Sequence, residues 1–448
     1  FKNKNVVITH KLFERLDLDC LTLLKSKNYH LVIDEEPVMF ELVADRYTIV
    51  FKKSKQKQTI SSKEVESLFK LNVLDLAKDK TTIVWKGPDL PRYQDLKEDI
   101  DNNRIVLYNH TNNGQTNKIL MWQQNPEIFN AFKTAHVLTY LFKNSFLNAF
   151  LDINEIPYII KNLTEEEALD DSKLKPYYKC IHLDSFVLTS NNVRKKSEVT
   201  NFLSSTWFDK YNIKYPIGSP NPLRTKLNTY YKKDLSFTGK PSKVKERLWT
   251  TLKRSKSRLV TNGIIDPELF VAFNKRATNT YIKCNHLAFI YNIFPNPLLT
   301  NYIKSMGIKT PVEDTYALSI LIQWIFRSAI REGKDIDLLL PSIRMTDLLR
   351  QWMDELKELY EYCRYIRDNI NDPIIKNEDH AMAITSFDDF VTIYQPGLRH
   401  YKKLPLLLSK FPVIKHQPIK PKPSRKKAAK KHNRKRLVVQ KKERLTRK

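Results

Sequence analysis

The chain has 448 residues, which is enough for two or three domains, and its composition of 41% hydrophobic and 28% charged residues is typical of a soluble globular protein. No apolar run reaches the ~18 residues that cross a bilayer, no secretory signal opens the chain, and four widely spaced cysteines exclude a disulfide framework. These features predict a cytoplasmic protein without a membrane partner. The formal net charge of +28 predicts a polyanionic partner, and nucleic acid is the first candidate.

Short apolar runs with strand character alternate with segments of helical length. The runs are 6–9, 31–33, 105–108, 136–142, 269–273, 287–291 and 336–340. Continuous apolar runs separated by helices are typical of parallel strands that are buried on both faces. The expected fold class is therefore α/β, with two units built on mostly parallel sheets.

The expected boundaries follow from these runs and from shifts in composition. A first domain is expected over 1–165 and a second over 245–345, separated by a linker or insertion over 166–244 that is rich in Lys, Tyr, Ser and Asn. A helical extension is expected over 346–413. The last segment, 414–448, has a composition that cannot bury a core and is expected to be disordered.

This tail concentrates the positive charge. Residues 415–448 contain 16 Lys and Arg and one acid, so about half of the net charge lies there. Electrostatic binding of nucleic acid without sequence preference is the safest expectation, beside an import signal or a solubilising end. The tail residues expected to bind are Arg425, Lys426, Lys427, Lys430, Lys431, Arg434, Lys435 and Arg436.

Three acids, Asp34, Glu35 and Glu36, follow the early apolar run Leu31-Val32-Ile33. Ligands of open α/β sheets bind beyond the carboxyl ends of the strands. An Asp there can hold the Mg²⁺ that bridges two phosphates of a nucleotide, and a neighbouring Glu can orient the attacking water. A solvated acidic turn is the alternative.

A late helix carries the complementary charges. Thr310-Pro311-Val312-Glu313 fits a capping box, apolar residues follow at helical spacing, and Gly333 ends the segment. Gln323, Arg327 and Arg331 are spaced i, i+4, i+8, which predicts one stripe that can reach a γ-phosphate. A solvated basic face is the alternative.

These segments together resemble superfamily 2 helicases. The segments VVITH (6–10), HLVIDEE (30–36), LTYLF (138–142) and the Gln323–Arg331 stretch occur in the order of the helicase motifs. FNKRATNTY (273–281) and ALSILIQWIFRSAIR (317–331) look like replication proteins of phages, plasmids and other mobile elements, which are similar to viral origin-binding helicases.

The resemblance implies two RecA-like domains, with ATP between them and a nucleic-acid strand across both. It implies that Asp34 binds Mg²⁺, that Glu35 activates water, and that Arg327 is an arginine finger beside Gln323 and Arg331. It also assigns Thr9, His10, Thr139, Arg276, Thr278 and Asn279 to strand binding, to the cleft or to coupling.

One motif of that family is missing. A superfamily 2 ATPase needs a G-x-x-x-x-G-K-[ST] phosphate loop before its acidic motif, but the first glycine of this chain is Gly87. Either the loop lies upstream of Phe1, which the start without Met favours, or the protein is a degenerate relative. The roughly 100 residues between Glu35 and Thr139 imply an insertion.

Two smaller patterns have alternative readings. Cys180-x-His182 and Cys284-x-His286 could hold Zn²⁺, but buried side chains explain them better because the spacing is atypical. Tyr-Lys clusters at 177–179 and 230–233 could stack bases or lie on an ordinary surface.

The sequence therefore predicts an ATP-dependent nucleic-acid helicase or translocase, a hydrolase with ATP and Mg²⁺ as cofactors, acting in DNA replication of a mobile element. DNA is preferred to RNA as the expected partner, and other replication proteins are compatible partners. The alternative is a DNA- or origin-binding protein without catalysis on a degenerate helicase scaffold.

Overall fold

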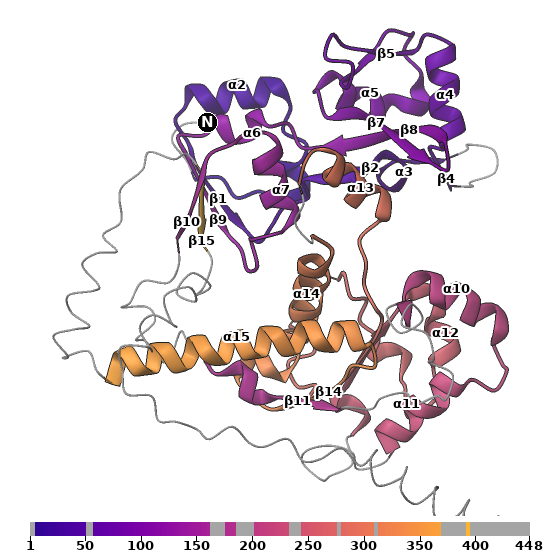
Figure 1. Ribbon diagram of the computed structural model, residues 1–448, viewed down its shortest axis with the longest axis vertical. Coiled ribbons are helices and arrows are strands. Elements are labelled where there is room, and N and C mark those ends of the chain that lie inside the picture. Colours follow the sequence, from indigo (N-terminus) through magenta and orange to yellow (C-terminus); the bar gives the residue numbers. More distant parts are fainter. Residues whose placement is uncertain are drawn as a thin grey trace, which may run out of the picture. The chain divides into compact units, whose positions relative to one another are not determined.

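The computed structural model describes residues 5–50, 57–161, 175–184, 201–232, 243–275, 279–308, 312–368 and 391–394. All of them belong to one structural unit, Phe1–His400. This unit contains two four-stranded sheets in which every strand pair is parallel (Figure 1). The expected α/β fold class with parallel sheets is confirmed.

The first sheet has the strand order β1-β9-β15-β10. Its strands are β1 (His30–Asp34), β9 (Thr134–Leu138), β15 (Val391–Tyr394) and β10 (Tyr158–Lys161). Asp34 is paired with Leu138, so β1 and β9 end at the same edge. β15 occupies the position between β9 and β10 although it comes from much later in the chain. The sequence alone predicts a helical extension for this stretch.

Short helices and buried aromatic residues support the first sheet. The helices are α1 (His10–Phe13), α2 (Leu18–Ser26), α6 (Glu127–Asn130) and α7 (Phe146–Ile153). Phe129, Phe142 and Phe150 are fully buried in this core. Burial of each such ring stabilises the fold by about 2–3 kcal/mol.

An antiparallel subdomain lies between β1 and β9, where the sequence implies an insertion. The subdomain contains a three-stranded sheet with the order β2-β8-β7 and two strand pairs, β3-β4 and β5-β6. The strands are β2 (Phe40–Leu42), β3 (Thr48–Val50), β4 (Lys57–Thr59), β5 (Leu74–Leu76), β6 (Ile83–Trp85), β7 (Ile105–Asn112) and β8 (Gln115–Gln123). The helices are α3 (Val43–Arg46), α4 (Ser62–Lys70), η1 (Pro91–Tyr93) and α5 (Gln94–Asp101). The subdomain has a separate core, which includes Val65, Leu96 and Trp122.

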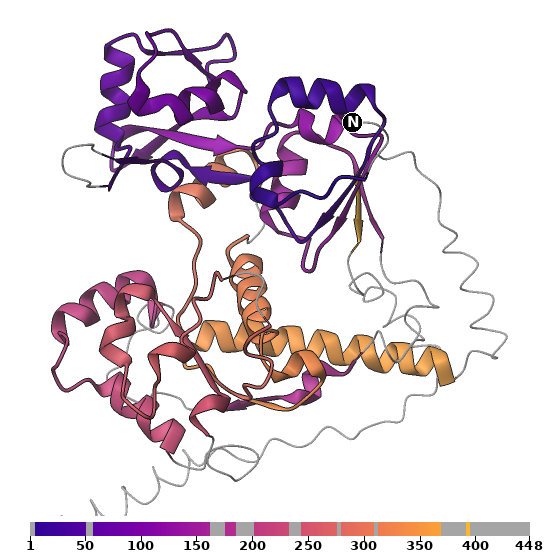
Figure 2. The same ribbon diagram turned by 180° about the vertical axis from the view of Figure 1, so that it is seen from behind.

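The second sheet has the order β11-β14-β13-β12. Its strands are β11 (Ile181–Asp184), β14 (Ile336–Leu339), β13 (His286–Ile290) and β12 (Arg247–Thr251). Every residue of β12, β13 and β14 is buried, because helices pack on both faces of the sheet (Figure 2). The helical segments of this region are η2 (Tyr177–Cys180), α10 (Ser205–Lys214), α11 (Pro222–Lys232), η3 (Val244–Glu246), η4 (Lys253–Ser255), α12 (Lys256–Leu259), η5 (Pro267–Leu269), α14 (Val312–Ile325), η6 (Ala329–Glu332) and α15 (Ile343–Asp368).

Much of the expected linker 166–244 is part of the second fold. β11 pairs with β14, and Phe208 of α10 and Leu227 of α11 lie in the same buried cluster as the sheet. The sequence of this stretch resembles a linker because its polar residues lie on the outer faces of helices whose inner faces are apolar.

Helix α13 (Pro297–Ser305) follows β13 but packs into the core of the first sheet. Tyr302 makes edge-to-face contacts with Phe40 and Tyr108, at 5.9 Å and 5.6 Å between ring centroids, and donates a hydrogen bond of 3.1 Å to Gln123. Burial raises the pKa of Tyr302 to about 12. This helix therefore packs on the antiparallel sheet through specific contacts.

Three strand predictions are corrected. Residues 6–9 form no strand: Val7 is 97% exposed, and Thr9 is the N-cap of α1. The run 269–273 forms only a single bridge between Phe270 and Trp249, because η5 occupies its start. The run 105–108 is a strand, but it pairs in an antiparallel hairpin with β8. Apolar content alone does not give the direction or the partner of a strand.

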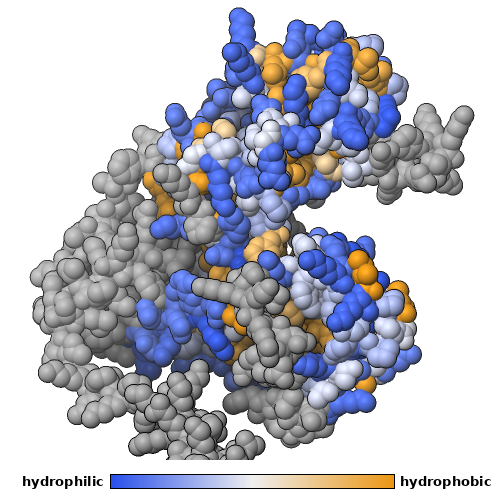
Figure 3. Space-filling view, turned by 45° about the vertical axis from the view of Figure 1, so that its right-hand side comes forward, coloured by the Kyte–Doolittle hydropathy of each residue, from blue (hydrophilic) through white to orange (hydrophobic). Residues whose placement is uncertain are grey.

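Among the described helices, none combines the length and apolar character that a membrane span requires. On the face shown in Figure 3, hydrophilic residues predominate and hydrophobic residues lie in small groups. Both observations agree with the absence of long apolar runs in the sequence.

Candidate functional site

The acidic motif stands at the carboxyl edge of the first sheet. Asp34 is the last residue of β1, and the Glu35 N–H donates a hydrogen bond of 2.8 Å to the Leu138 carbonyl at the end of β9. Thr139 follows directly and is 9% exposed. The structure therefore brings Asp34, Glu35 and Thr139 to the same edge, where open α/β sheets bind ligands.

Two backbone conformations at this edge are unusual. Glu35 has a φ of 67° and Leu141 a φ of 61°, both in the left-handed region that costs a non-glycine residue about 1–2 kcal/mol. Such strain persists only where the surrounding structure imposes it, and it concentrates at functional sites. The strained residues follow β1 and β9, the two strands that deliver the acidic motif and Thr139.

Glu36 is tied to the start of α7. Its carboxylate accepts a hydrogen bond of 2.5 Å from the Leu147 N–H, and Ser145 caps the same helix by accepting from the Asn148 N–H at 3.1 Å. The positive end of the helix dipole stabilises a carboxylate here. The contact fixes the direction in which the chain leaves β1.

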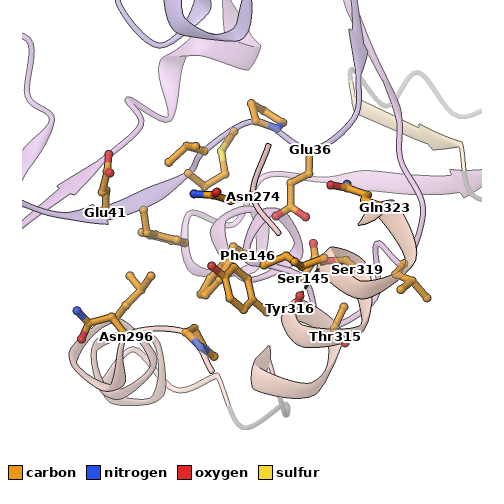
Figure 4. Close-up of a pocket in the computed structure, with 18 of the residues that line it drawn as sticks. Glu36, Glu41, Ser145, Phe146, Asn274, Asn296, Thr315, Tyr316, Ser319 and Gln323 are labelled. Carbon is orange, nitrogen blue, oxygen red and sulfur yellow. Dashed lines mark hydrogen bonds between the residues drawn. The ribbon is translucent and has the colours of Figure 1, made fainter. Parts of the chain in front are cut away.

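A cavity of about 350 Å³ opens beside Glu36 (Figure 4). This volume lies within the ~300–1,000 Å³ range of ligand pockets. Its walls come from the segment after β1, the start of α7, the segment 273–274, the start of α13 and one side of α14. The lining residues are Glu36, Pro37, Val38, Met39, Phe40, Glu41, Leu42, Asp45, Leu141, Ser145, Phe146, Phe273, Asn274, Pro295, Asn296, Leu299, Thr315, Tyr316, Ser319, Ile320 and Gln323.

Three segments that the sequence alone predicts to be functional motifs meet at this cavity. They contribute Glu36 of the acidic motif, Phe273 and Asn274 of the FNKRATNTY stretch, and Gln323 of α14. In Figure 4 the side chains of Glu36 and Gln323 lie on the same side of the cavity, and Asn274 lies near its centre. Segments that are distant in the sequence therefore share one concave site.

The predicted Gln-Arg-Arg stripe does not form. α14 ends at Ile325, Arg327 lies in the turn that follows, and Arg331 belongs to η6. In this turn the N–H groups of Arg327 and Ser328 donate to carbonyls three residues earlier, and the Ala329 N–H donates to the carbonyl of Cys284 at 2.9 Å instead of to a carbonyl of the helix. The prediction of one helix through Arg331 is therefore wrong, and the three side chains do not share one helical face.

The two arginines have different surroundings. Arg327 is 8% exposed, and Arg331 donates a hydrogen bond of 2.6 Å to the side chain of Asn279. Neither arginine lines the cavity. Their predicted roles at a γ-phosphate, like those of Asp34 and Glu35 in catalysis, stay predictions.

The other residues that the sequence predicts to be functional do not line the cavity or lie outside the described residues. Thr9 accepts a hydrogen bond of 3.2 Å from the Leu12 N–H, and His10 begins α1. Arg276, Thr278, the expected helix cap at 310–311 and the basic residues of the tail fall outside the described residues.

The described side chains that could hold a metal ion are few. Within the described part of the chain, no three His, Cys, Asp or Glu residues form a group that could hold a metal ion. A single exposed carboxylate such as Asp34 still fits Mg²⁺, because Mg²⁺ keeps several waters and takes other ligands from substrate phosphates. Of the Cys-x-His pairs, Cys284 is buried, and burial raises the pKa of its thiol to about 11.

The aromatic wall of the cavity has no signal in the sequence. Phe146 and Tyr316 make an edge-to-face contact with ring centroids 5.4 Å apart. Phe146 follows the helix cap Ser145, and Tyr316 lies near the start of α14, so the sequence around each is typical of ordinary helix packing. Only the contact between segments 170 positions apart in the sequence shows their common location.

A relative among known proteins places the chain in a family. The "SPbeta prophage-derived uncharacterized protein YonV" of Bacillus subtilis (strain 168) is 31% identical over 365 residues, which cover 79% of this chain and 80% of the relative. The chain belongs to the YonV family. The model of the YonV C-terminal Rossmann-like domain matches residues 176–353. No solved structure matches the chain.

The YonV domain match agrees with the structure of the second sheet. Its range, 176–353, runs from η2 and β11 into α15 and includes most of the stretch expected to be a linker. The second sheet is therefore the core of a Rossmann-like domain. In this YonV-family chain, the cavity combines residues of this domain with residues of the preceding one.

Proposed function

We propose that this YonV-family chain is an ATP-dependent helicase or translocase that acts on DNA during replication of a mobile element. The observation that carries the proposal is the cavity shared by Glu36, Asn274 and Gln323. Three segments that resemble separate helicase motifs line it together. The prophage origin of the relative supports the link to a mobile element.

The proposed roles follow from the sheet edge. Asp34 would hold Mg²⁺, which supplies charge neutralisation for the phosphates when it is bound. Glu35 would orient the attacking water next to it. Arg327, Arg331 and Gln323 would approach from the second domain and stabilise the charge that develops on the leaving group.

The proposal requires a phosphate-binding element outside the cavity wall. Among the described residues that line the cavity, none is Lys or Arg, and the sequence contains no G-x-x-x-x-G-K-[ST] segment. We therefore expect residues 1–448 alone to bind ATP weakly. Tight magnesium-dependent binding by this chain would show that its phosphate contacts come from residues other than those of the cavity wall and the acidic motif.

The first test is Glu35→Gln, measured on the chain extended by any in-frame sequence that precedes Phe1. We expect ATP hydrolysis stimulated by DNA in the unsubstituted protein and a loss of at least a hundredfold in the variant, because Gln cannot accept a proton. Glu66→Gln on α4, outside the site, is the matched control and should retain the rate. Equal turnover in Glu35→Gln and the unsubstituted protein would remove the role given to Glu35.

A second candidate is a DNA-binding protein that uses the same scaffold without catalysis. The lack of Lys and Arg among the described residues of the cavity wall, together with the basic tail, favours it. It predicts salt-sensitive duplex binding and no ATP hydrolysis in any extended form of the chain. The hydrolysis assay above therefore distinguishes the two candidates.

A further inference from the structure

Three of the four described aromatic residues that line the cavity are partly exposed, whereas the fourth, Phe40, is buried. Phe146, Tyr316 and Phe273 are each half-buried, in contrast to the fully buried phenylalanines of the neighbouring core. Phe273 is itself stacked on Tyr291, with ring centroids 5.0 Å apart and an interplanar angle of 30°. Supported aromatic rings with free surface are the groups on which proteins stack flat heterocycles.

Among the described residues of the cavity wall, the charged side chains are acidic and oppose phosphate binding. The wall contains three carboxylates, Glu36, Glu41 and Asp45. Glu41 pairs with Arg46 at 2.9 Å, whereas the Asp45 carboxylate accepts a hydrogen bond of 3.2 Å from the neutral amide of Asn296. Glu36 accepts a hydrogen bond from the Leu147 N–H. A phosphate placed among these carboxylates would be repelled.

Polar side chains near the rings can read the edge of a heterocycle. The amide of Asn274 offers donors and an acceptor, and Ser319 adds a hydroxyl. Figure 4 shows Ser319, Phe146 and Tyr316 grouped on one side of Asn274. Amide side chains form paired hydrogen bonds with the edge of adenine.

We infer that the cavity binds a nucleobase, an uncharged heteroaromatic ring, and leaves the phosphates of the same ligand outside. This inference rests on the proposed function, because it names the part of the nucleotide or nucleic acid that enters the cavity. The base could belong to a free nucleotide or to a single strand. The chemistry of the wall is the same for both sources.

The test measures binding to the full 448-residue chain by calorimetry, without magnesium. The probes are adenosine, ATP, inorganic pyrophosphate and a short oligonucleotide of deoxyadenosine. We expect adenosine to bind at least as tightly as ATP, and pyrophosphate to leave adenosine binding unchanged. Competition by pyrophosphate, or ATP binding tenfold tighter than adenosine, would overturn the inference.

Substitutions locate the binding. Phe146→Ala should weaken adenosine binding by about tenfold through loss of one stacking surface. Tyr215→Ala, a half-buried aromatic residue of the second domain that does not line the cavity, is the matched control. An equal loss in Phe146→Ala and Tyr215→Ala, with both variants folded by circular dichroism, would contradict the assignment.

The probes also separate the two sources and the two proposals. If the oligonucleotide displaces adenosine and Phe146→Ala weakens both, the base comes from a strand. If only the mononucleosides bind, it comes from a free nucleotide. Failure of every base-containing probe to bind would contradict the inference. None of these measurements requires hydrolysis, so a negative result for Glu35→Gln leaves them interpretable.

Discussion

At the scale of single residues, Glu35 combines an exposed side chain with a left-handed backbone. A glycine would adopt this conformation without the steric cost of a Cβ. Glu35 therefore lowers the free energy of unfolding relative to a glycine at the same position. Other non-glycine residues, among them Lys80 and Glu155, share this conformation, so the position of Glu35 next to the acidic motif, and not the strain alone, makes its side chain a candidate for function.

Glu35→Gly should therefore stabilise the protein. We expect an increase of about 0.5–1 kcal/mol in the free energy of unfolding, because relief of the left-handed strain exceeds the added entropy of glycine in the unfolded chain. Urea denaturation followed by circular dichroism measures it. Glu66→Gly, in the interior of α4, is the matched control and should destabilise by about 1 kcal/mol. Equal destabilisation by both changes would show that Glu35 is not strained.

At the scale of elements, a buried ionic network joins α1 to the antiparallel subdomain. Arg46 at the end of α3 contacts Glu14 at 3.3 Å and Glu41 at 2.9 Å, and its guanidinium lies 3.8 Å from the ring centroid of Trp122. Tyr47 donates to Asp99, and burial together with that carboxylate raises the pKa of Tyr47 far above its usual value. The network fixes the subdomain to the carboxyl end of α1.

Arg46→Met tests this coupling. Glu14 is 1% exposed and also pairs with the exposed Lys11, so loss of Arg46 removes the largely buried cation that Glu14 shares with Glu41 and Asp99 in this network. We expect a loss of about 3 kcal/mol in the free energy of unfolding. Arg92→Met, which breaks a half-exposed pair with Glu64, is the control and should cost less than about 1 kcal/mol. Equal losses in the two variants would mean that the buried network adds no specific stability.

At the scale of the whole molecule, the chain crosses between the two sheets more than once. α13 follows a strand of the second sheet and packs on the antiparallel sheet of the preceding region, and β15 follows α15 in the sequence but joins the first sheet. Both crossings join segments that are remote in sequence. They explain why domain boundaries drawn as consecutive ranges do not describe this molecule fully.

The charge of the whole molecule gives a prediction for the tail. Deletion of residues 415–448 removes a net charge of +15. We expect affinity for duplex DNA to fall by tenfold or more at low salt, with a shallower dependence of log affinity on log salt concentration. Fluorescence anisotropy at several salt concentrations measures both quantities.

A shuffled tail of the same composition is the control for this deletion. It should restore binding, because electrostatic attraction to phosphates does not depend on the order of the charges. Full affinity without any tail would place the binding charges in the preceding residues.

The sequence by itself determined the α/β class, the apolar runs 31–33, 287–291 and 336–340 that lie in or overlap β1, β13 and β14, and a helical segment from about residue 346 that lies in α15. These are local properties, because apolar runs and helical spacing act over a few residues. It also indicated Glu36, Asn274 and Gln323 through their neighbouring motifs.

Tertiary structure decided the rest. α14 ends at Ile325, and beyond it the Ala329 N–H donates to the carbonyl of Cys284, so Gln323 and the two arginines do not lie on one helix. The pairing of β15, the folding of the expected linker and the meeting of Phe146 with Tyr316 likewise depend on contacts between remote segments. Such contacts have no local signature, since their energy comes from surfaces that become neighbours only when the chain folds.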